Sequence, residues 1–133
     1  MTTFPPNSPP ARILLVDQET PSREATGRML RNHGFLPRTA ANRHEALGAI
    51  REELIELAIV NISLPGAEGI ATILGILASA PEMRIIALVG ENAQASGLAK
   101  SLGACALAGD PLDGPSLAAT VRELLRSSAR QVA

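Results

Sequence analysis

One stretch constrains the fold of this chain more than any other: the apolar run 57–60, which ends in Asn61 and is followed by the turn-forming residues Pro65 and Gly66. A short apolar run with β-branched members, closed by turn residues, is typical of a strand that is buried on both faces of a parallel sheet. Ligands bind to such sheets outside the carboxyl ends of the strands. Asn61 stands at this end, so we expect its side chain to face the site.

Similar apolar runs alternate with helical periodicity along the rest of the chain. The expected strands are 12–17, 35–40, 57–61, 84–89 and 104–108, and the expected helices begin near Thr20, Asn42, Gly69, Asn92 and Pro115. We expect Thr20 and Asn42 to cap the first two helices and the last helix to end near Arg126. Strands that alternate with helices imply a parallel sheet covered on both faces, because crossovers between parallel strands are nearly always right-handed. The sequence therefore predicts an α/β fold, a flavodoxin-like (βα)5 doubly wound sheet of five parallel strands in the order 2-1-3-4-5.

Length and composition fit one domain, since the chain has 133 residues of which 46% are apolar. We expect a disordered Pro-rich leader over 1–10, a domain over 11–127 and a frayed tail over 128–133. The net charge of −1 provides no basic surface for nucleic acid, and no uncharged run reaches the roughly 20 residues of a membrane span. A single cysteine and the lack of a secretory signal favour a cytoplasmic protein.

Taken together, these segments resemble the response-regulator receiver domains of bacterial two-component signalling, from residue 12 to about 126. The stretch 57–69 resembles the third-strand segment of that family, in which an aspartate accepts a phosphoryl group just before a Pro-Gly-x-x-Gly turn. The resemblance implies a site made of two adjacent acids after strand one, the acceptor, a Thr or Ser ending strand four, an aromatic in strand five and a lysine before a proline. In the family the acids hold Mg²⁺, which with the lysine stabilises the transferring phosphoryl group.

This sequence departs from the family pattern at most of these positions. Asp17 is retained, but Asn61 stands at the acceptor position, and an amide oxygen cannot form an acyl phosphate because its lone pairs are delocalised and it carries no charge. The other residues of the predicted degenerate pocket are Gln18 at the second acid, Glu19 beside it, Val89 at the hydroxyl, Leu107 at the switch aromatic and Asp110 at the lysine. A neutral Asn61 also avoids a cluster of like charges with Asp17 and Asp110.

We therefore expect a stand-alone pseudo-receiver that is not an enzyme and that acts by phosphorylation-independent protein–protein interaction in a two-component or phosphorelay-type system. The expected partner is a histidine kinase, another signalling protein or a second copy of the chain, and not nucleic acid or a membrane. An alternative is a small-ligand or cation binding module that uses the vacated strand-end pocket. No cofactor is expected, although Asp17 and Glu19 are weak candidates for Mg²⁺ binding. Phosphate acceptance at one of these two acids is a less favoured third hypothesis.

Two surfaces with few charges are candidate interfaces. The first is the outer side of the predicted third helix, where small uncharged residues would let another helix approach closely. Its inner stripe is expected to be Ile70, Ile73, Leu74 and Leu77. The second surface is the fourth helix, fifth strand and fifth helix, which typical receivers use for dimerisation. The candidate interface residues are Ala71, Gly75 and Ala78 on the first surface and Leu98, Ala106 and Arg122 on the second.

Overall fold

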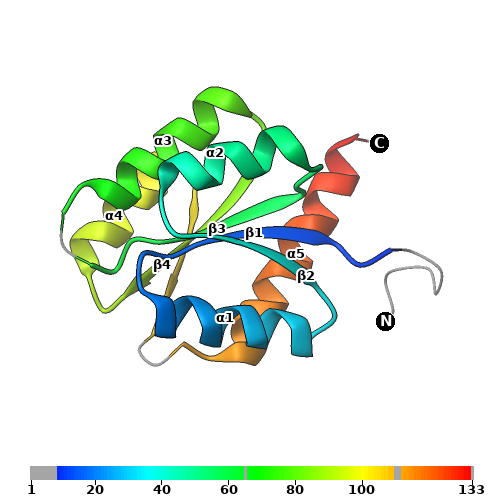
Figure 1. Ribbon diagram of the computed structural model, residues 1–133, viewed down its shortest axis with the longest axis horizontal. Coiled ribbons are helices and arrows are strands. Elements are labelled where there is room, and N and C mark those ends of the chain that lie inside the picture. The colour runs from blue at the N-terminus through cyan, green and yellow to red at the C-terminus, as the bar shows by residue number, and fades with distance from the viewer. Residues whose placement is uncertain (1–8, 65, 110–111, 133) are drawn as a thin grey trace.

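The computed structural model shows five parallel strands in one sheet, with helices on both of its faces (Figure 1). It describes residues 9–64, 66–109 and 112–132, of which 128–132 are described by their backbone alone. The strands are β1 (Arg12–Val16), β2 (Leu36–Ala40), β3 (Leu57–Asn61), β4 (Arg84–Gly90) and β5 (Cys105–Ala108). The helices are α1 (Thr20–Asn32), α2 (Arg43–Glu52), α3 (Glu68–Ser79), α4 (Ala93–Ser101) and α5 (Gly114–Val132). The strand order β2-β1-β3-β4-β5 confirms the predicted flavodoxin-like fold.

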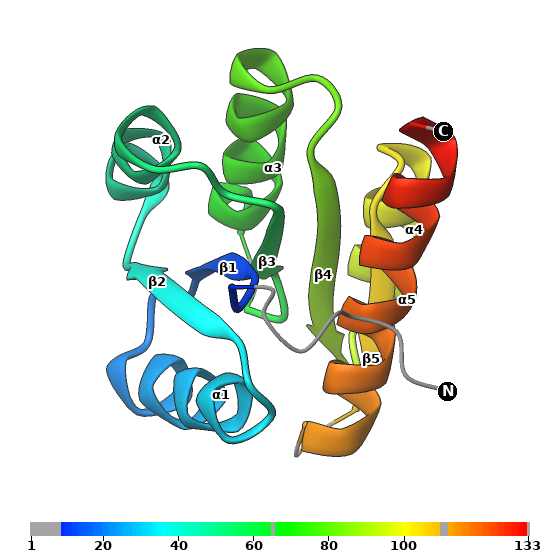
Figure 2. The same cartoon turned by 90° about the vertical axis from the view of Figure 1, so that its right-hand side faces the viewer.

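Each face of the sheet carries its own apolar core, because successive side chains of a strand point to opposite faces. Helices α2, α3 and α4 cover one face, and α1 and α5 cover the other (Figures 1 and 2). Within β3, Ala58 and Val60 belong to the first core, whereas Leu57 and Ile59 belong to the second. Burial on both sides explains why β1, β3 and β4 read as almost continuous apolar runs.

Asparagine side chains begin two of the helices, as the sequence predicts for Asn42. Asn42 Oδ1 accepts a hydrogen bond from the backbone N–H of Glu45 (2.9 Å), and Asn92 Oδ1 accepts one from that of Ala95 (3.0 Å). The prediction that Thr20 caps α1 is wrong. Thr20 is already the first helical residue, and its hydroxyl accepts a hydrogen bond from Arg23 (3.2 Å) instead of a backbone N–H.

Two helices differ from the sequence-based expectation. Helix α5 continues to Val132, past Arg126, and the intervening sequence contains no Gly or Pro to end it. In α3 the buried side chains are Thr72, Ile73 and Ile76, whereas Leu74 is 51% exposed. Ile73 is buried and Ile70 and Leu77 pack against the same core, as expected, so Leu74 is the one residue of the expected inner stripe that lies outside. The hydroxyl of Thr72 donates to the Glu68 carbonyl (2.9 Å), which allows this polar residue to be buried.

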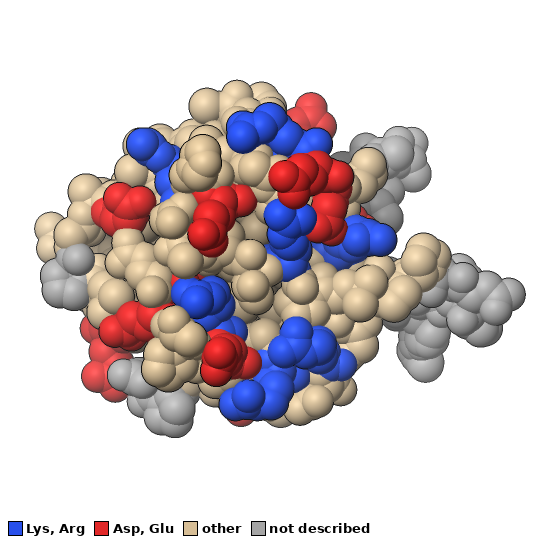
Figure 3. Space-filling model, viewed as in Figure 1, with Lys and Arg blue, Asp and Glu red and all other residues tan. Residues whose placement is uncertain are grey.

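Acidic residues at the end of α2 form ion pairs with arginines of neighbouring strands. Arg38 of β2 contacts both Glu52 (2.8 Å) and Glu53, and Arg12 of β1 contacts Glu53 (2.9 Å). Lysine and arginine side chains are interspersed with acidic ones on the face seen in Figure 3. Over the residues described, no helix is long and apolar enough to cross a membrane.

Candidate functional site

Asp17 directly follows β1 at the carboxyl edge of the sheet, and its side chain is only 1% exposed. Its Oδ1 accepts a hydrogen bond from the backbone N–H of Glu19 (3.0 Å). Its Oδ2 accepts two more, from Ser22 Oγ (2.5 Å) and from Asn61 Nδ2 (3.1 Å). A buried carboxylate is tolerated when donors surround it in this way. The Asp17 carboxylate therefore has hydrogen-bond donors on both oxygens.

Asn61 ends β3 and uses both ends of its amide. Nδ2 donates to Asp17, while Oδ1 accepts from the backbone N–H of Ser63 (2.9 Å) and from Ser63 Oγ (2.7 Å). An amide can donate and accept at once, whereas an ionised carboxylate can only accept. An aspartate at this position would therefore lose the bond to Asp17 and place two negative groups in contact. The neutral side chain joins β1 to the loop after β3.

The structure brings together some of the predicted pocket residues. Asp17, Glu19 and Asn61 gather at the carboxyl edge, where Glu19 and its neighbour Gln18 are exposed to solvent. Leu107 is partly buried against the core on the α1 and α5 face. Asp110 lies outside the described residues.

Val89 does not line a cavity at this edge, and its place at the family's hydroxyl position stays a prediction. Strand alternation directs Val89 into the core beneath α3 and α4, where it is 2% exposed. Leu88 and Gly90 instead line a cavity at the carboxyl edge of the sheet, which is described below. The pairing of β4 with β5 shifts register between these two residues. Gly90 has a φ of +59°, and a Cβ on it would lie 3.1 Å from the Cβ of Ser63. A side chain at the last position of β4 would therefore be strained by the positive φ and would make a tight contact with Ser63.

Three hydroxyl residues of this edge were missed in the sequence analysis: Ser22, Thr26 and Ser63. All three line a cavity of about 390 Å³ at the carboxyl edge, together with Asn61. Ser22 and Thr26 are one helical turn apart on α1, just after the retained Asp17, and Ser63 stands two residues after Asn61. This spacing from the two site residues is the signal that could have identified them.

The residues present do not fit a Mg²⁺ ion. Magnesium requires several oxygen ligands in octahedral geometry. Within the described ranges, no group of three or more His, Cys, Asp or Glu side chains comes together. Both oxygens of Asp17 already accept hydrogen bonds, and Asn61 presents its nitrogen to the carboxylate. The Arg23 side chain on α1 donates to the Asp17 carbonyl oxygen (2.7 Å) and not to its carboxylate.

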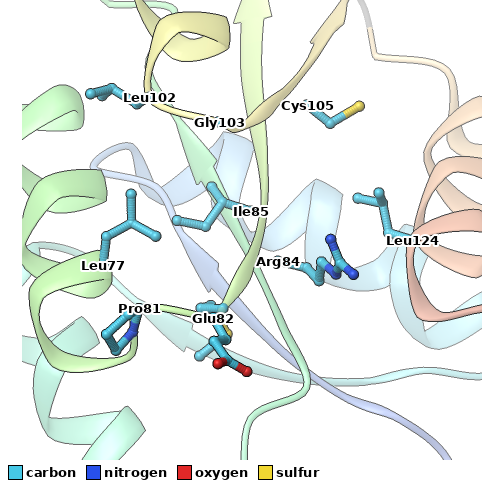
Figure 4. A pocket seen from close by; sticks show the side chains of 10 residues that line it. Leu77, Pro81, Glu82, Arg84, Ile85, Leu102, Gly103, Cys105 and Leu124 are labelled. Carbon is cyan, nitrogen blue, oxygen red and sulfur yellow. The ribbon is translucent and has the colours of Figure 1, made fainter. Parts of the chain in front are cut away.

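A larger cavity of about 670 Å³ lies at the opposite edge of the sheet, where β4 and β5 begin. Leu77 of α3 and Leu124 of α5 lie on opposite sides of β4, with Arg84 and Cys105 also at its wall (Figure 4). It contains none of the predicted pocket residues. Because open α/β sheets bind ligands at the carboxyl ends of their strands, we assign the candidate site to the other edge.

Two of the predicted interface residues are held within the chain. Gly75 faces α2, since a Cβ on it would lie 3.2 Å from Cδ of Arg43. The small residue therefore allows the close approach of α2 within the same chain, and not of a partner helix. Arg122 lies 5.5 Å from the centre of the Phe35 ring and donates to the His33 carbonyl (3.2 Å). The remaining candidates are exposed in the case of Ala78 and Leu98 and partly buried in the case of Ala71 and Ala106.

Comparison with known proteins agrees with this geometry. The family model of the response regulator receiver domain matches residues 13–107. The CheY-like response regulator receiver domain protein from Methanospirillum hungatei JF-1 is 28% identical, with a TM-score of 0.80 over 92% of this chain and 98% of that one. NtrX from Brucella abortus, solved in complex with ADP, is 27% identical, with a TM-score of 0.84 over 92% of this chain but 28% of its own. No match was found among curated proteins.

Proposed function

This chain belongs to the response regulator receiver domain family, and from that premise we propose that it is a degenerate receiver that signals by protein contact, without phosphorylation at residue 61. Receiver domains act in two-component signalling, where they interact with proteins such as kinases. We further propose that residues 11–127 form the receiver-like domain, which acts in the cytoplasm with no catalytic role of its own.

The hydrogen bond between Asn61 and Asp17 is the observation that carries this proposal. Phosphoryl transfer to a receiver needs a nucleophilic oxygen at the end of β3 and positive charge to stabilise the transferring group. Here the Asn61 amide donates an N–H hydrogen bond to the Asp17 carboxylate, in the place where a cation would otherwise contact that carboxylate. The two side chains complete each other's hydrogen bonds without a metal, and residue 61 offers no nucleophile.

Two further features support the same proposal. Neither Val89, which is buried in the core, nor Gly90, which ends β4, carries a hydroxyl. Leu107 packs its aliphatic side chain against the core, where the family has an aromatic that changes position on activation. These substitutions remove the group that would contact a phosphoryl oxygen and the group that would report its presence.

The exposed parts of the two candidate interfaces suit a protein partner. Leu98 on α4 is 48% exposed and Leu74 on α3 is 51% exposed. Large apolar side chains in contact with solvent gain free energy when a partner covers them. We propose that a signalling protein such as a histidine kinase, or a second copy of the chain, contacts one of these helices.

The test is intact-mass spectrometry after incubation with acetyl phosphate and Mg²⁺, and separately with a histidine kinase and ATP. We expect no gain of a phosphoryl group in either reaction. Asn61→Asp should also remain unmodified or react slowly, because the hydroxyl at the end of β4 is still missing. A phosphoryl group mapped to Asp17, Glu19 or the loop after β3 in the unmodified chain would contradict the proposal.

A further inference from the structure

The cavity at the carboxyl edge of the sheet has a lining that the proposed signalling by protein contact does not use. Its volume is about 390 Å³, and its described walls come from Glu19 and α1, the end of β3 and the loop after it, the end of β4, and Gly109 and Leu112 after β5. This volume falls within the range of sites for small organic molecules. Gly90 and Gly109 lie at its wall and contribute no side chains to fill it.

Thr26 provides the first indication of a ligand. The residue is 4% exposed, and its hydroxyl makes no hydrogen bond within the described part of the chain. Over the same residues no fully enclosed side-chain oxygen or nitrogen lacks a partner, so this hydroxyl opens into the cavity that Thr26 lines. Thr72, which is similarly buried on α3, instead donates to the Glu68 carbonyl. A polar group that is almost buried without a partner is uncommon in folded proteins.

The charges at the cavity specify the kind of ligand. Glu19 and Glu91 line it, and the buried carboxylate of Asp17 lies behind Ser22 and Asn61. No lysine or arginine is present among the described lining residues. This arrangement repels phosphate and other anions and favours a positive charge.

The remaining lining favours an organic cation over a metal ion. Leu88 and Leu112 contribute apolar surface, which an aliphatic ligand would cover. A divalent cation would need several carboxylates at close range, and in the described residues no such group exists. An ammonium group instead needs only hydrogen-bond acceptors and a carboxylate nearby.

We propose that this cavity binds a small aliphatic ammonium compound that also carries hydroxyl groups, of the chemical class of amino alcohols and amino sugars. Its ammonium group interacts with Glu19 and Glu91, a polar group completes the hydrogen bonding of Thr26, and its carbon frame covers Leu88. The inference is independent of the proposed function, because ligand binding here requires neither phosphorylation nor its absence.

The experiment compares ammonium probes with neutral probes of nearly the same shape. Glucosamine is titrated against glucose, and 4-amino-1-butanol against 1,4-butanediol, into the full chain by isothermal titration calorimetry below the pKa of the amines. Inorganic phosphate and MgCl₂ are titrated in parallel. We expect at least one amine to bind at a single site, more tightly than its neutral counterpart by about tenfold or more, and we expect no heat from phosphate.

Matched variants locate the site. Thr26→Val should weaken amine binding by about two- to tenfold, the range of one hydrogen bond, without lowering the melting temperature, because the lost hydroxyl has no partner. The control Thr72→Val should lower the melting temperature and leave amine binding unchanged. Glu91→Gln should weaken binding and reduce its salt dependence, whereas Glu82→Gln at the opposite edge should not.

Four results would overturn the inference: no amine binds, the neutral probes bind as tightly, phosphate binds more tightly, or Thr26→Val and Glu91→Gln bind as the unmodified chain does. None of these results affects the mass-spectrometric test of residue 61. The failure of one proposal is therefore distinguishable from the failure of the other.

Discussion

Replacing Asn61 with aspartate should destabilise the fold at neutral pH, although it restores the residue type of the receiver family. The Asn61 amide nitrogen lies 3.1 Å from Asp17 Oδ2, and Asp17 is 1% exposed. Loss of a hydrogen bond to a buried charged group costs about 1.5–3 kcal/mol. Two negative charges at this separation repel by about 5 kcal/mol at an effective dielectric constant of roughly 20.

Proton binding limits this penalty. One carboxyl of the pair can take up a proton, which costs about 1.4 kcal/mol for each pH unit above its ordinary pKa of about 4. The cost of charge repulsion in the variant is therefore at most about 4 kcal/mol at pH 7 and about 1 kcal/mol at pH 5. A proton shared between the two carboxyl groups would also replace the lost hydrogen bond. We expect Asn61→Asp to lose about 2–4 kcal/mol near pH 7.

The sign of the pH dependence follows from the raised pKa. The folded variant binds a proton more tightly than the unfolded chain, so its stability is retained below the ordinary pKa and is lost as the pH rises through the folded-state pKa. The difference from the unmodified chain should shrink toward pH 5. Added Mg²⁺ should stabilise the variant and not the unmodified chain, because only the variant has two facing carboxylates.

Urea denaturation followed by far-ultraviolet circular dichroism measures this effect, since the chain has no Trp or Tyr for fluorescence. The matched control is Asn92→Asp, in which a carboxylate can accept the same hydrogen bond from Ala95 at the start of α4. This change should be neutral or slightly stabilising. If Asn61→Asp is as stable as the unmodified chain near pH 7 without divalent cations, or if its loss does not vary with pH, the reasoning is refuted.

Two further predictions concern packing and surface charge. Gly69→Ala should lower the free energy of unfolding by about 1–3 kcal/mol, because its Cβ would overlap the side chain of Ile62, whereas Gly48→Ala, whose Cβ would meet open space, should raise it by roughly 0.5–1 kcal/mol in urea titrations. The Glu53 side chain has its pKa lowered from 4.5 chiefly by hydrogen bonds from Arg38, so its contribution is present above that pH and is lost as the pH falls through the lower folded-state value. Thermal melts of Glu53→Gln should therefore differ from those of the unmodified chain near pH 7 and converge with them toward about pH 3, and a difference that persists in acid would contradict this account.

The sheet and most helix starts could be predicted because they depend on local patterns. The alternation of apolar runs with helical periodicity is visible in the sequence, and Asn42 caps α2 as its residue type suggests. The burial of Thr72 and the exposure of Leu74 in α3 could not be predicted from hydrophobicity alone, because the Thr72 hydroxyl forms its hydrogen bond within the helix. Hydrophobicity ranks these two residues in the opposite order.

The site could be predicted only in part, for a related reason. That Asp17 and Asn61 share an edge follows from the parallel sheet, but the bond between them depends on the orientation of an amide. Val89 was assigned to the pocket although it lies one residue from Leu88, which faces the opposite way along β4. That the Thr26 hydroxyl has no hydrogen-bond partner among the described residues can be recognised only from the three-dimensional structure, because it depends on the positions of all neighbouring polar groups.

The close approach of α2 to α3 determines what the outside of the molecule can offer. Because Gly75 is turned toward Arg43, the residues of α3 that remain exposed between 70 and 79 are Leu74, Ala78 and Ser79. A partner helix that packed along this surface would cover one large apolar side chain, Leu74. A partner that binds this surface therefore needs an apolar pocket for Leu74, and its recognition of α3 would depend on shape and not on charge.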